Sequence, residues 1–294
     1  MKKYYSFAGV DIEIEMPDEV MYTEERYLEA FRCNANNSAF LHCFRFEVVK
    51  ELTPPEGTCI ANEGGLRVYV QDEMQVRYIG SVQQSWENAY LRVTHRDYEH
   101  SVQLKQSAQI NKIGVHTVLN SLAAEHLITG ADGFLFHSSY IEWHGKGILF
   151  TAPSGTGKST QADLWEKLRG AEILNGDRSA VRCCEDGSVL VCGVPFAGSS
   201  QICKNRTLPL GAIVYLKQAP QTTIRRLRGA EAFRRVWEGC SVNTWDREDV
   251  MSISETVQRV VMAVPVFELA CTPDESAVMA LERALEKESG WYEE

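Results

Sequence analysis

The chain has 294 residues, of which 44% are apolar and 24% are charged, and its formal net charge is −10. A chain of this length and apolar content can bury a substantial core, which excludes a disordered protein and suffices for one large domain or two smaller ones. The negative charge argues against general binding to nucleic acid or to an anionic membrane surface. No apolar run is long enough for a membrane-spanning helix, and the first residues lack the pattern of a secretory signal.

Nine cysteines are scattered along the chain, without a CxxC pair or the spacing of a zinc site. Most of them lie inside apolar runs, where free cysteine behaves as a small buried apolar residue. Their odd number and the lack of a secretory signal favour a reducing compartment. We therefore expect a cytoplasmic protein.

Residues 1–105 are predicted to form a β-rich N-terminal region. Alternating or clustered apolar residues between polar turns are typical of half-buried strands. The stretches with this pattern are YYSFAGV, DIEIEM, FLHCFRFEVV, LRVYVQ, MQVRYI and AYLRVTH. We expect this region to shape an acceptor site or to provide a contact in a homo-oligomer.

Residues 106–294 are predicted to form an α/β domain with a mixed sheet flanked by helices, because strands and helices alternate there. A helical pattern at 112–128 precedes two strands, FLFHSSYIEW and GILFTA, joined by the tight turn HGKG. The later elements are the helix STQADLWEKLR, the strand AEILNGD, a hairpin of AVRCC and SVLVCGV, the strand AIVYLKQ, helices near 229–238 and 249–263, the strand VFELA and a helix over 275–288.

The segment APSGTGKS at residues 152–159 matches a phosphate-binding loop, except that Ala152 stands where the general pattern has glycine. Small residues and glycines let successive backbone N–H groups point at phosphate oxygens, and a following helix N-terminus favours anions. Lys158 is expected to reach the β- and γ-phosphates, and the Ser159 hydroxyl to bind Mg²⁺. The residues expected to bind ATP here are Ser154, Gly155, Thr156, Gly157, Lys158, Ser159 and Thr160.

Two further residues are candidates for the chemistry. Asp177 ends the run AEILNG, where an acidic residue beside such a loop is a Mg²⁺ ligand or a catalytic base. His137 lies on the strand predicted to pair with the strand before the loop, where it could stabilise a transferring phosphoryl group or orient an acceptor hydroxyl. The alternatives are a turn aspartate in Asn-Gly-Asp and a structural histidine.

Three segments, TAPSGTGKSTQA, ILNGDRSAV and NRTLPLGAIVYLKQAPQTTIRRL, resemble the HPr kinase/phosphorylase-like and phosphoenolpyruvate-carboxykinase-like superfamily. The resemblance covers roughly residues 115–290 and implies a P-loop kinase fold. It implies catalytic roles for His137 and Asp177, together with Lys158, and it implies basic residues near phosphate, for which Lys204 and Arg206 are the candidates.

The sequence departs from the superfamily at two places. Arg178 stands where the family has a second aspartate, so an acid is followed by a base. The Glu-Arg-Gly signature of true HPr kinases is absent, and GVPFAGSSQICKNR stands in that region. The closer resemblance is to divergent HPr kinase-like proteins, some of them associated with peptide modification.

We therefore expect a kinase that uses ATP and Mg²⁺ to phosphorylate a serine-type hydroxyl of a peptide, protein or small metabolite. Two alternatives stay open: a regulatory or scaffolding protein that binds nucleotide without phosphotransfer, because Arg178 could neutralise Asp177, and a carboxykinase-like or pyrophosphate-using activity. The arginines between residues 225 and 235 could bind an acidic peptide or phosphate. The simpler interpretation is that they lie on a solvated helix face and pair with glutamates.

Overall fold

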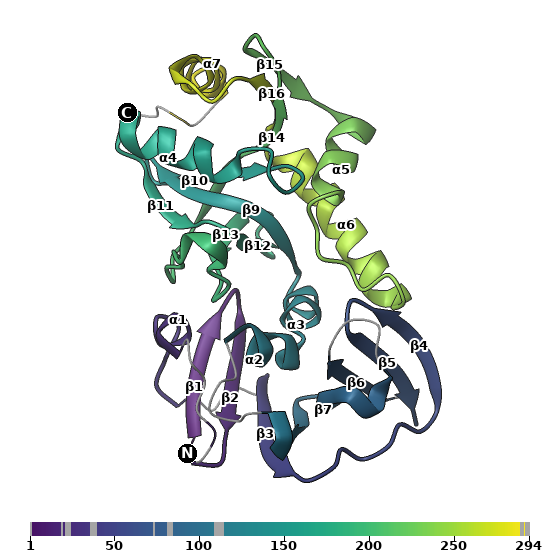
Figure 1. Cartoon of the computed structure of the whole chain (residues 1–294). Helices are drawn as coiled ribbons and strands as arrows, with labels where there is room; N and C mark the ends of the chain where they lie inside the picture. Colours follow the sequence, from purple (N-terminus) through teal and green to yellow (C-terminus); the bar gives the residue numbers. More distant parts are fainter. Residues whose placement is uncertain are drawn as a thin grey trace. The chain divides into compact units, whose positions relative to one another are not determined.

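The computed structural model describes residues 2–18, 20, 25–35, 40–72, 74–80, 85–108, 115–288 and 291. The chain forms two compact units, residues 1–127 and 128–294 (Figure 1). The sequence placed the boundary near residue 105, whereas this division falls after Leu127. The reason is that α2 (Val115–Leu122) packs on α1 (Glu25–Glu29) and on strand β7 (Ala89–Arg96) of the first unit. Residues 112–114 of the predicted helix lie outside the described residues.

The first unit is built on one mixed sheet. All six predicted stretches form strands, and β4 and β8 were not predicted. Within the described residues the spatial order is β1 (Lys2–Phe7), β2 (Val10–Glu15), β3 (Leu41–Val49), β8 (Glu99–Lys105), β7 (Ala89–Arg96), β6 (Met74–Gly80), β5 (Leu66–Gln71) and β4 (Thr58–Glu63). The β2–β3 and β3–β8 pairs are parallel, and the other pairs are antiparallel.

Three histidines meet inside this unit on β3, β7 and β8. His42 Nδ1 lies 3.1 Å from His100 Nε2, and His95 Nδ1 lies 3.3 Å from His100 Nδ1. The buried His100 ring stacks on Phe44 at a centroid distance of 4.1 Å. Burial lowers the pKa of His100 to about 3, and burial, then the charge of Arg77, lowers the pKa of His95 well below 6.5. These rings are therefore neutral at physiological pH.

The second unit holds a mixed sheet of long, buried strands. Its order is β10 (Lys146–Thr151), β9 (Gly133–Trp143), β12 (Arg178–Cys183), β13 (Val189–Gly193), β14 (Thr207–Gln218), β16 (Val266–Cys271) and β15 (Thr223–Leu227), and β11 (Glu172–Asn175) pairs with β9. Because β10 also pairs with β14, the strands from β10 to β14 close a ring of hydrogen-bonded neighbours. Strand β15 was not predicted from the sequence.

Helices cover both faces of this sheet, as an α/β fold requires (Figure 1). Ile148 and Phe150 of β10 pack with α4 (Lys158–Arg169) and α7 (Glu275–Leu285), where the fully buried Trp165 and Leu281 lie. Leu149, which points to the opposite face, packs with α5 (Gly229–Trp237) and α6 (Arg247–Ala263). The predicted mixed sheet with flanking helices is confirmed in this coarse form.

Two smaller expectations can be compared with the structure. All nine cysteines are free thiols, in agreement with the expected absence of a disulfide framework. Among the described helices, none is long and apolar enough to span a bilayer.

The histidine cluster predicts that the first unit loses stability in acid. The unfolded chain binds protons below about pH 6.5, whereas the folded unit does not until the pH approaches the lowered pKa values. Stability is therefore full above pH 6.5 and falls as the pH falls toward 3, by at most about 1.4 kcal/mol per pH unit for each histidine. Hydrogen exchange of the β3 and β8 amides at several pH values, corrected for intrinsic rates, measures this slope. His100→Phe should reduce the slope, and an unchanged slope would contradict the account.

Candidate active site

The glycine loop, defined here as residues 152–157, leaves the end of β10 and enters α4 directly. Its two positive φ angles belong to Gly155 (78°) and Gly157 (117°), and a Cβ at either position would meet no atom within 4 Å. The glycines are thus required by backbone conformation and not by crowding. Ala152 is buried and has no such φ angle, so this conformation does not require the glycine of the general pattern at that position.

Lys158 is the first residue of α4 and is only 8% exposed. Its Nζ donates a hydrogen bond to the carbonyl oxygen of Ala152, at 3.0 Å, across the base of the loop. Burial lowers the pKa of Lys158, and the charge of Asp177 acts in the opposite direction. The ammonium group is therefore desolvated and close enough to Asp177 to feel its charge.

The N-terminus of α4 differs from those of α6 and α7. Asp246 caps α6 and Asp274 caps α7, each accepting hydrogen bonds from backbone N–H groups of the first turn. The N-cap of α4 is Gly157, which has no side chain to offer. Among the described residues, no side chain caps the first N–H groups of this helix, and Ser159 and Thr160 beside them are exposed.

Asp177 lies in the short link between β11 and β12, and Asn175 fixes its backbone. The fully buried Asn175 side chain accepts hydrogen bonds from the N–H groups of Asp177 (2.9 Å) and Arg178 (3.1 Å). Its amide nitrogen donates to the carbonyl oxygen of Val194 at 2.9 Å. The Asn-Gly-Asp turn is thus held by a buried side chain, and it leaves the Asp177 carboxylate about one-third exposed.

His137 lies opposite Arg178 in the β9–β12 pair, so both side chains are on one face of the sheet. His137 Nε2 lies 3.9 Å from Asp177 Oδ1, which is longer than a hydrogen bond. Burial first, and then the charge of Lys158, lowers the pKa of His137. The imidazole is therefore neutral at physiological pH and can donate or accept a hydrogen bond.

Arg178 is held by three neighbours. Its Nη1 donates to Ser241 Oγ at 2.6 Å, and its guanidinium lies 5.9 Å from the ring centroid of Phe196. Its Nε lies 3.7 Å from Asp177 Oδ2, which makes a loose ion pair. Arg178 is therefore anchored on Ser241, and it leaves Oδ1 of Asp177 to face His137.

Gly198 packs directly against Asp177. Its φ is 54°, and a Cβ built on it would lie 2.5 Å from Asp177 Cβ and 2.7 Å from Asp177 Cγ. Real Cβ atoms do not approach this closely, so a side chain at position 198 would displace the carboxylate. The position requires glycine both for its backbone conformation and for its contact.

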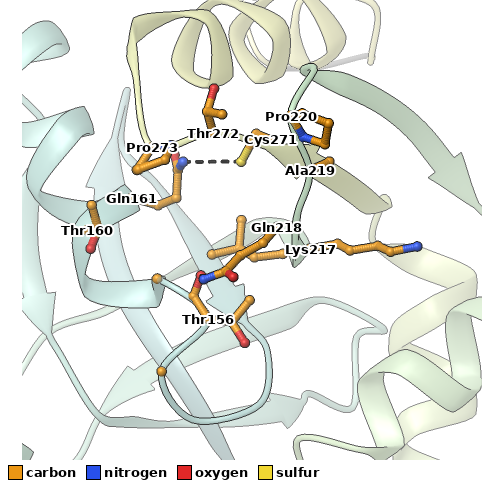
Figure 2. Close-up of a pocket in the computed structure, with 13 residues that line it drawn as sticks. Thr156, Thr160, Gln161, Lys217, Gln218, Ala219, Pro220, Cys271, Thr272 and Pro273 are labelled. Atoms are coloured by element: carbon orange, nitrogen blue, oxygen red, sulfur yellow. Dashed lines mark hydrogen bonds between the residues drawn. The ribbon is translucent and has the colours of Figure 1, made fainter.

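A cavity of about 540 Å³ adjoins the glycine loop on the side of β14 and β16 (Figure 2). Its walls come from the loop and the first turn of α4, from the end of β14 and from the end of β16. The lining residues are Gly155, Thr156, Gly157, Thr160, Gln161, Leu216, Lys217, Gln218, Ala219, Pro220, Cys271, Thr272 and Pro273. His137 and Asp177 do not line it, because β10 separates β14 from β9 in the sheet.

Arg206 is not brought to the loop. Its guanidinium pairs with Glu142 at 2.6 Å and lies 3.9 Å from Glu172. Glu142 is opposite Gly147 at the beginning of β10, whereas the loop follows Thr151 at its end. Lys204 likewise pairs with Glu172, at 2.7 Å. The resemblance implied that these cations lie near phosphate, but they lie at the end of β14 away from the glycine loop.

Two further residues lie beside the loop, and only one of them, Arg235 of the arginine cluster, was a candidate from the sequence. Gln161 lines the cavity from α4, and Arg235 lines a second hollow with Ser154, Thr156 and Tyr215. Arg235 stacks on the ring of Tyr215 at 4.3 Å and pairs with Glu238 at 3.0 Å. Arg235 was predicted only as one member of a basic cluster in an acidic protein, and Gln161 was not predicted.

Comparison with known proteins gives one family. The family described as SynChlorMet cassette protein ScmC matches residues 101–276, which is more than half of the chain. No curated protein matches. Among solved structures, the Hpr(Ser) kinase/phosphatase from Coxiella burnetii is 11% identical, with a TM-score of 0.29, over 52% of this chain and 93% of that chain. This likeness is too weak to indicate a function. The match over residues 101–276 shows that the chain belongs to the ScmC family.

Proposed function

We propose that this protein is a kinase that uses ATP and Mg²⁺ to phosphorylate a hydroxyl group of a peptide, a protein or a small molecule. The observation that carries the proposal is the convergence of Lys158, Asp177 and His137 beside a glycine loop. Lys158 influences the pKa of His137, and Asp177 influences the pKa of both. Phosphoryl transfer needs a cation that stabilises phosphate charge, and the buried lysine at the start of α4 can provide it. It also needs groups that accept a proton and orient the acceptor, which the carboxylate and the neutral imidazole can provide.

The order of the strands supports a layout for the substrates. Strands β16, β14, β10, β9 and β12 are neighbours in that order. The cavity lies at the ends of β16 and β14, the glycine loop follows β10, and His137 and Asp177 belong to β9 and to the link before β12. A nucleotide in the cavity would extend its phosphates over the loop toward Asp177. Ligands in α/β sheets bind at such carboxyl ends of parallel strands.

The residues present fit a triphosphate with Mg²⁺. The uncapped first turn of α4 and the open space around Gly155 and Gly157 suit an anion. Ser159 would hold the metal together with substrate phosphates. Asp177, which the sequence predicts as a metal ligand or a catalytic base, is assigned the role of base. When bound, Mg²⁺ would neutralise charge on the β- and γ-phosphate oxygens.

In the proposed step, Asp177 accepts the proton of the acceptor hydroxyl. The hydroxyl oxygen forms a bond to the γ-phosphorus, and the bond from that phosphorus to the β–γ bridging oxygen breaks, with the electron pair leaving on ADP. Lys158 stabilises negative charge on the phosphates. His137, neutral and next to Asp177, orients the acceptor hydroxyl through a hydrogen bond.

One observation favours a second candidate, a nucleotide-binding regulator without phosphotransfer. The ion pair between Arg178 Nε and Asp177 Oδ2 reduces the negative charge available to a metal or a proton. However, the distance of 3.7 Å is long, and Arg178 already donates to Ser241. Both groups are about one-third exposed, so solvent weakens their attraction.

Removing the carboxylate tests the proposal. Asp177→Asn should lower phosphoryl transfer about 10²- to 10⁴-fold, the usual contribution of a general base, while ATP still binds. The assay follows label from γ-labelled ATP with water and N-acetylserine amide as acceptors. Asp186→Asn, in the exposed turn between β12 and β13, is the matched control. Full transfer by Asp177→Asn would refute the assignment, and absence of transfer by the unchanged protein would favour the regulator.

Removing the lysine tests the binding of phosphate. Lys158→Met should abolish the rise in melting temperature that ATP with Mg²⁺ gives the unchanged protein, because the buried cation at the base of the loop is lost. Lys167→Met, an exposed lysine of the same helix, should keep that rise. If both variants respond equally to ATP, the glycine loop is not the phosphate site.

Crowding the carboxylate tests its position separately from its chemistry. Gly198→Ala should lower transfer at least about tenfold, because misplacing a catalytic group by roughly 1 Å is costly, and should leave ATP binding intact. Gly187→Ala is the matched control, since Gly187 also has a positive φ, of 83°, but no atom lies within 4 Å of its Cβ position. Equal activity of both variants would show that the placement of Asp177 does not matter.

A further inference from the structure

Gln161 is the buried polar side chain in the wall of the cavity. It lies in the first turns of α4, is 2% exposed, and reaches toward the end of β16 (Figure 2). Its Nε2 donates a weak hydrogen bond to the sulfur of Cys271, at 3.5 Å. Burial raises the pKa of that thiol, so Cys271 stays protonated.

The other end of this amide is unsatisfied. Among the described residues, Gln161 Oε1 has no hydrogen-bond partner, although it is shielded from solvent. A buried carbonyl oxygen without a donor costs free energy, and native proteins rarely keep one without a reason. A ligand group that donates a hydrogen bond at this place would remove that cost.

The remaining walls suit a flat, mostly apolar ring. Leu216, Pro220 and Pro273 supply apolar surface, while Thr160 and Thr272 supply hydroxyl groups at the same cavity. A volume of about 540 Å³ lies within the range of ordinary small-ligand sites. Gly155 and Gly157 also line the cavity, so a base bound there would have its phosphates next to the glycine loop.

We propose that this cavity takes the adenine ring of the nucleotide, and that Gln161 Oε1 accepts a hydrogen bond from the 6-amino group. The inference rests on the proposed function, and it adds the place where the base binds and the residue that recognises it. An acceptor fixed at this point favours a base with an amino group there. A base with a 6-oxo group would place two oxygens against each other and leave both without a donor.

Three nucleotides test this inference with the full-length chain. ATP carries the 6-amino group, purine riboside triphosphate lacks it, and inosine triphosphate has a 6-oxo group instead. Calorimetry in the presence of Mg²⁺ should show ATP binding about tenfold tighter than purine riboside triphosphate, the worth of one hydrogen bond to an otherwise unpaired buried acceptor. Inosine triphosphate should bind no better than purine riboside triphosphate.

A substitution assigns the preference to one residue. Gln161→Met should remove the difference between ATP and purine riboside triphosphate. It should change the melting temperature little, because the lost carbonyl oxygen has no partner among the described residues and the lost Nε2 group gives up only its weak hydrogen bond to Cys271. Gln258→Met, at an exposed position of α6, is the control and should keep the difference.

The outcomes separate this inference from the proposed function. If the three triphosphates bind equally to the unchanged protein, or if Gln161→Met keeps the preference for ATP, the base inference is wrong while the kinase proposal stands. Tighter binding of inosine triphosphate would also overturn it, since Gln161 would then present its N–H group to the base. If no nucleotide binds, the proposed function fails and the base inference fails with it.

Discussion

The parallel pairing of β10 with β14 is the constraint on which the candidate site depends. It sets Thr151 opposite Tyr215, so the glycine loop and the segment after Tyr215 leave the sheet at the same edge. The antiparallel pairing of β9 with β10 then brings Ser138, and with it His137, to that edge. Because β10 is buried on both faces, a shift of one residue would exchange the contacts of Leu149 with those of Phe150. The packing of both layers of helices thus maintains the register that assembles the site.

The electrostatics of the site follow from the presence of one carboxylate beside two cationic side chains. One carboxylate, Asp177, lies among the cations Lys158 and Arg178 and the neutral ring of His137. Burial of the lysine and of the histidine disfavours their charged forms, and the charge of Asp177 favours them. Such a balance suits a site that receives an anion, since the phosphates would bring the missing negative charge. It also explains why Arg178 need not inactivate the site, because Ser241 supplies a second partner for its guanidinium.

Much of the second unit could be predicted from the sequence, because its signals are local. The alternation in the strands, the loop glycines and the C-cap Gly170, with a φ of 67°, all act within a few residues. The position of His137 near the loop was predicted from the hairpin that closes at HGKG, and that of Asp177 from the end of the run AEILNG; the resemblance to a known superfamily implied their catalytic roles. Their catalytic roles stay predictions.

The rest could not be predicted, because it depends on which strands pair. Arg206 lies just before β14, and the other end of β14 adjoins the glycine loop. Arg206 pairs with Glu142, and the pairing of β9 with β10 shows that Glu142 is at the end of the sheet away from that loop. Gln161 and Cys271 are 110 residues apart in the sequence and meet because β14 places β16 near the loop. Of the three unpredicted strands, β4 and β15 carry few buried residues, so their apolar pattern is weak, whereas β8 alternates buried and more exposed residues.

The central claim is that base, phosphates and acceptor lie in that order along one sheet edge. A crystal structure with a non-hydrolysable ATP analogue and Mg²⁺ tests it most directly. The account predicts the base between the ends of β14 and β16, the phosphates against the first turn of α4, and the γ-phosphate beside Asp177 and His137. A base bound on the side of β9 and β12, or phosphates away from the glycine loop, would contradict it.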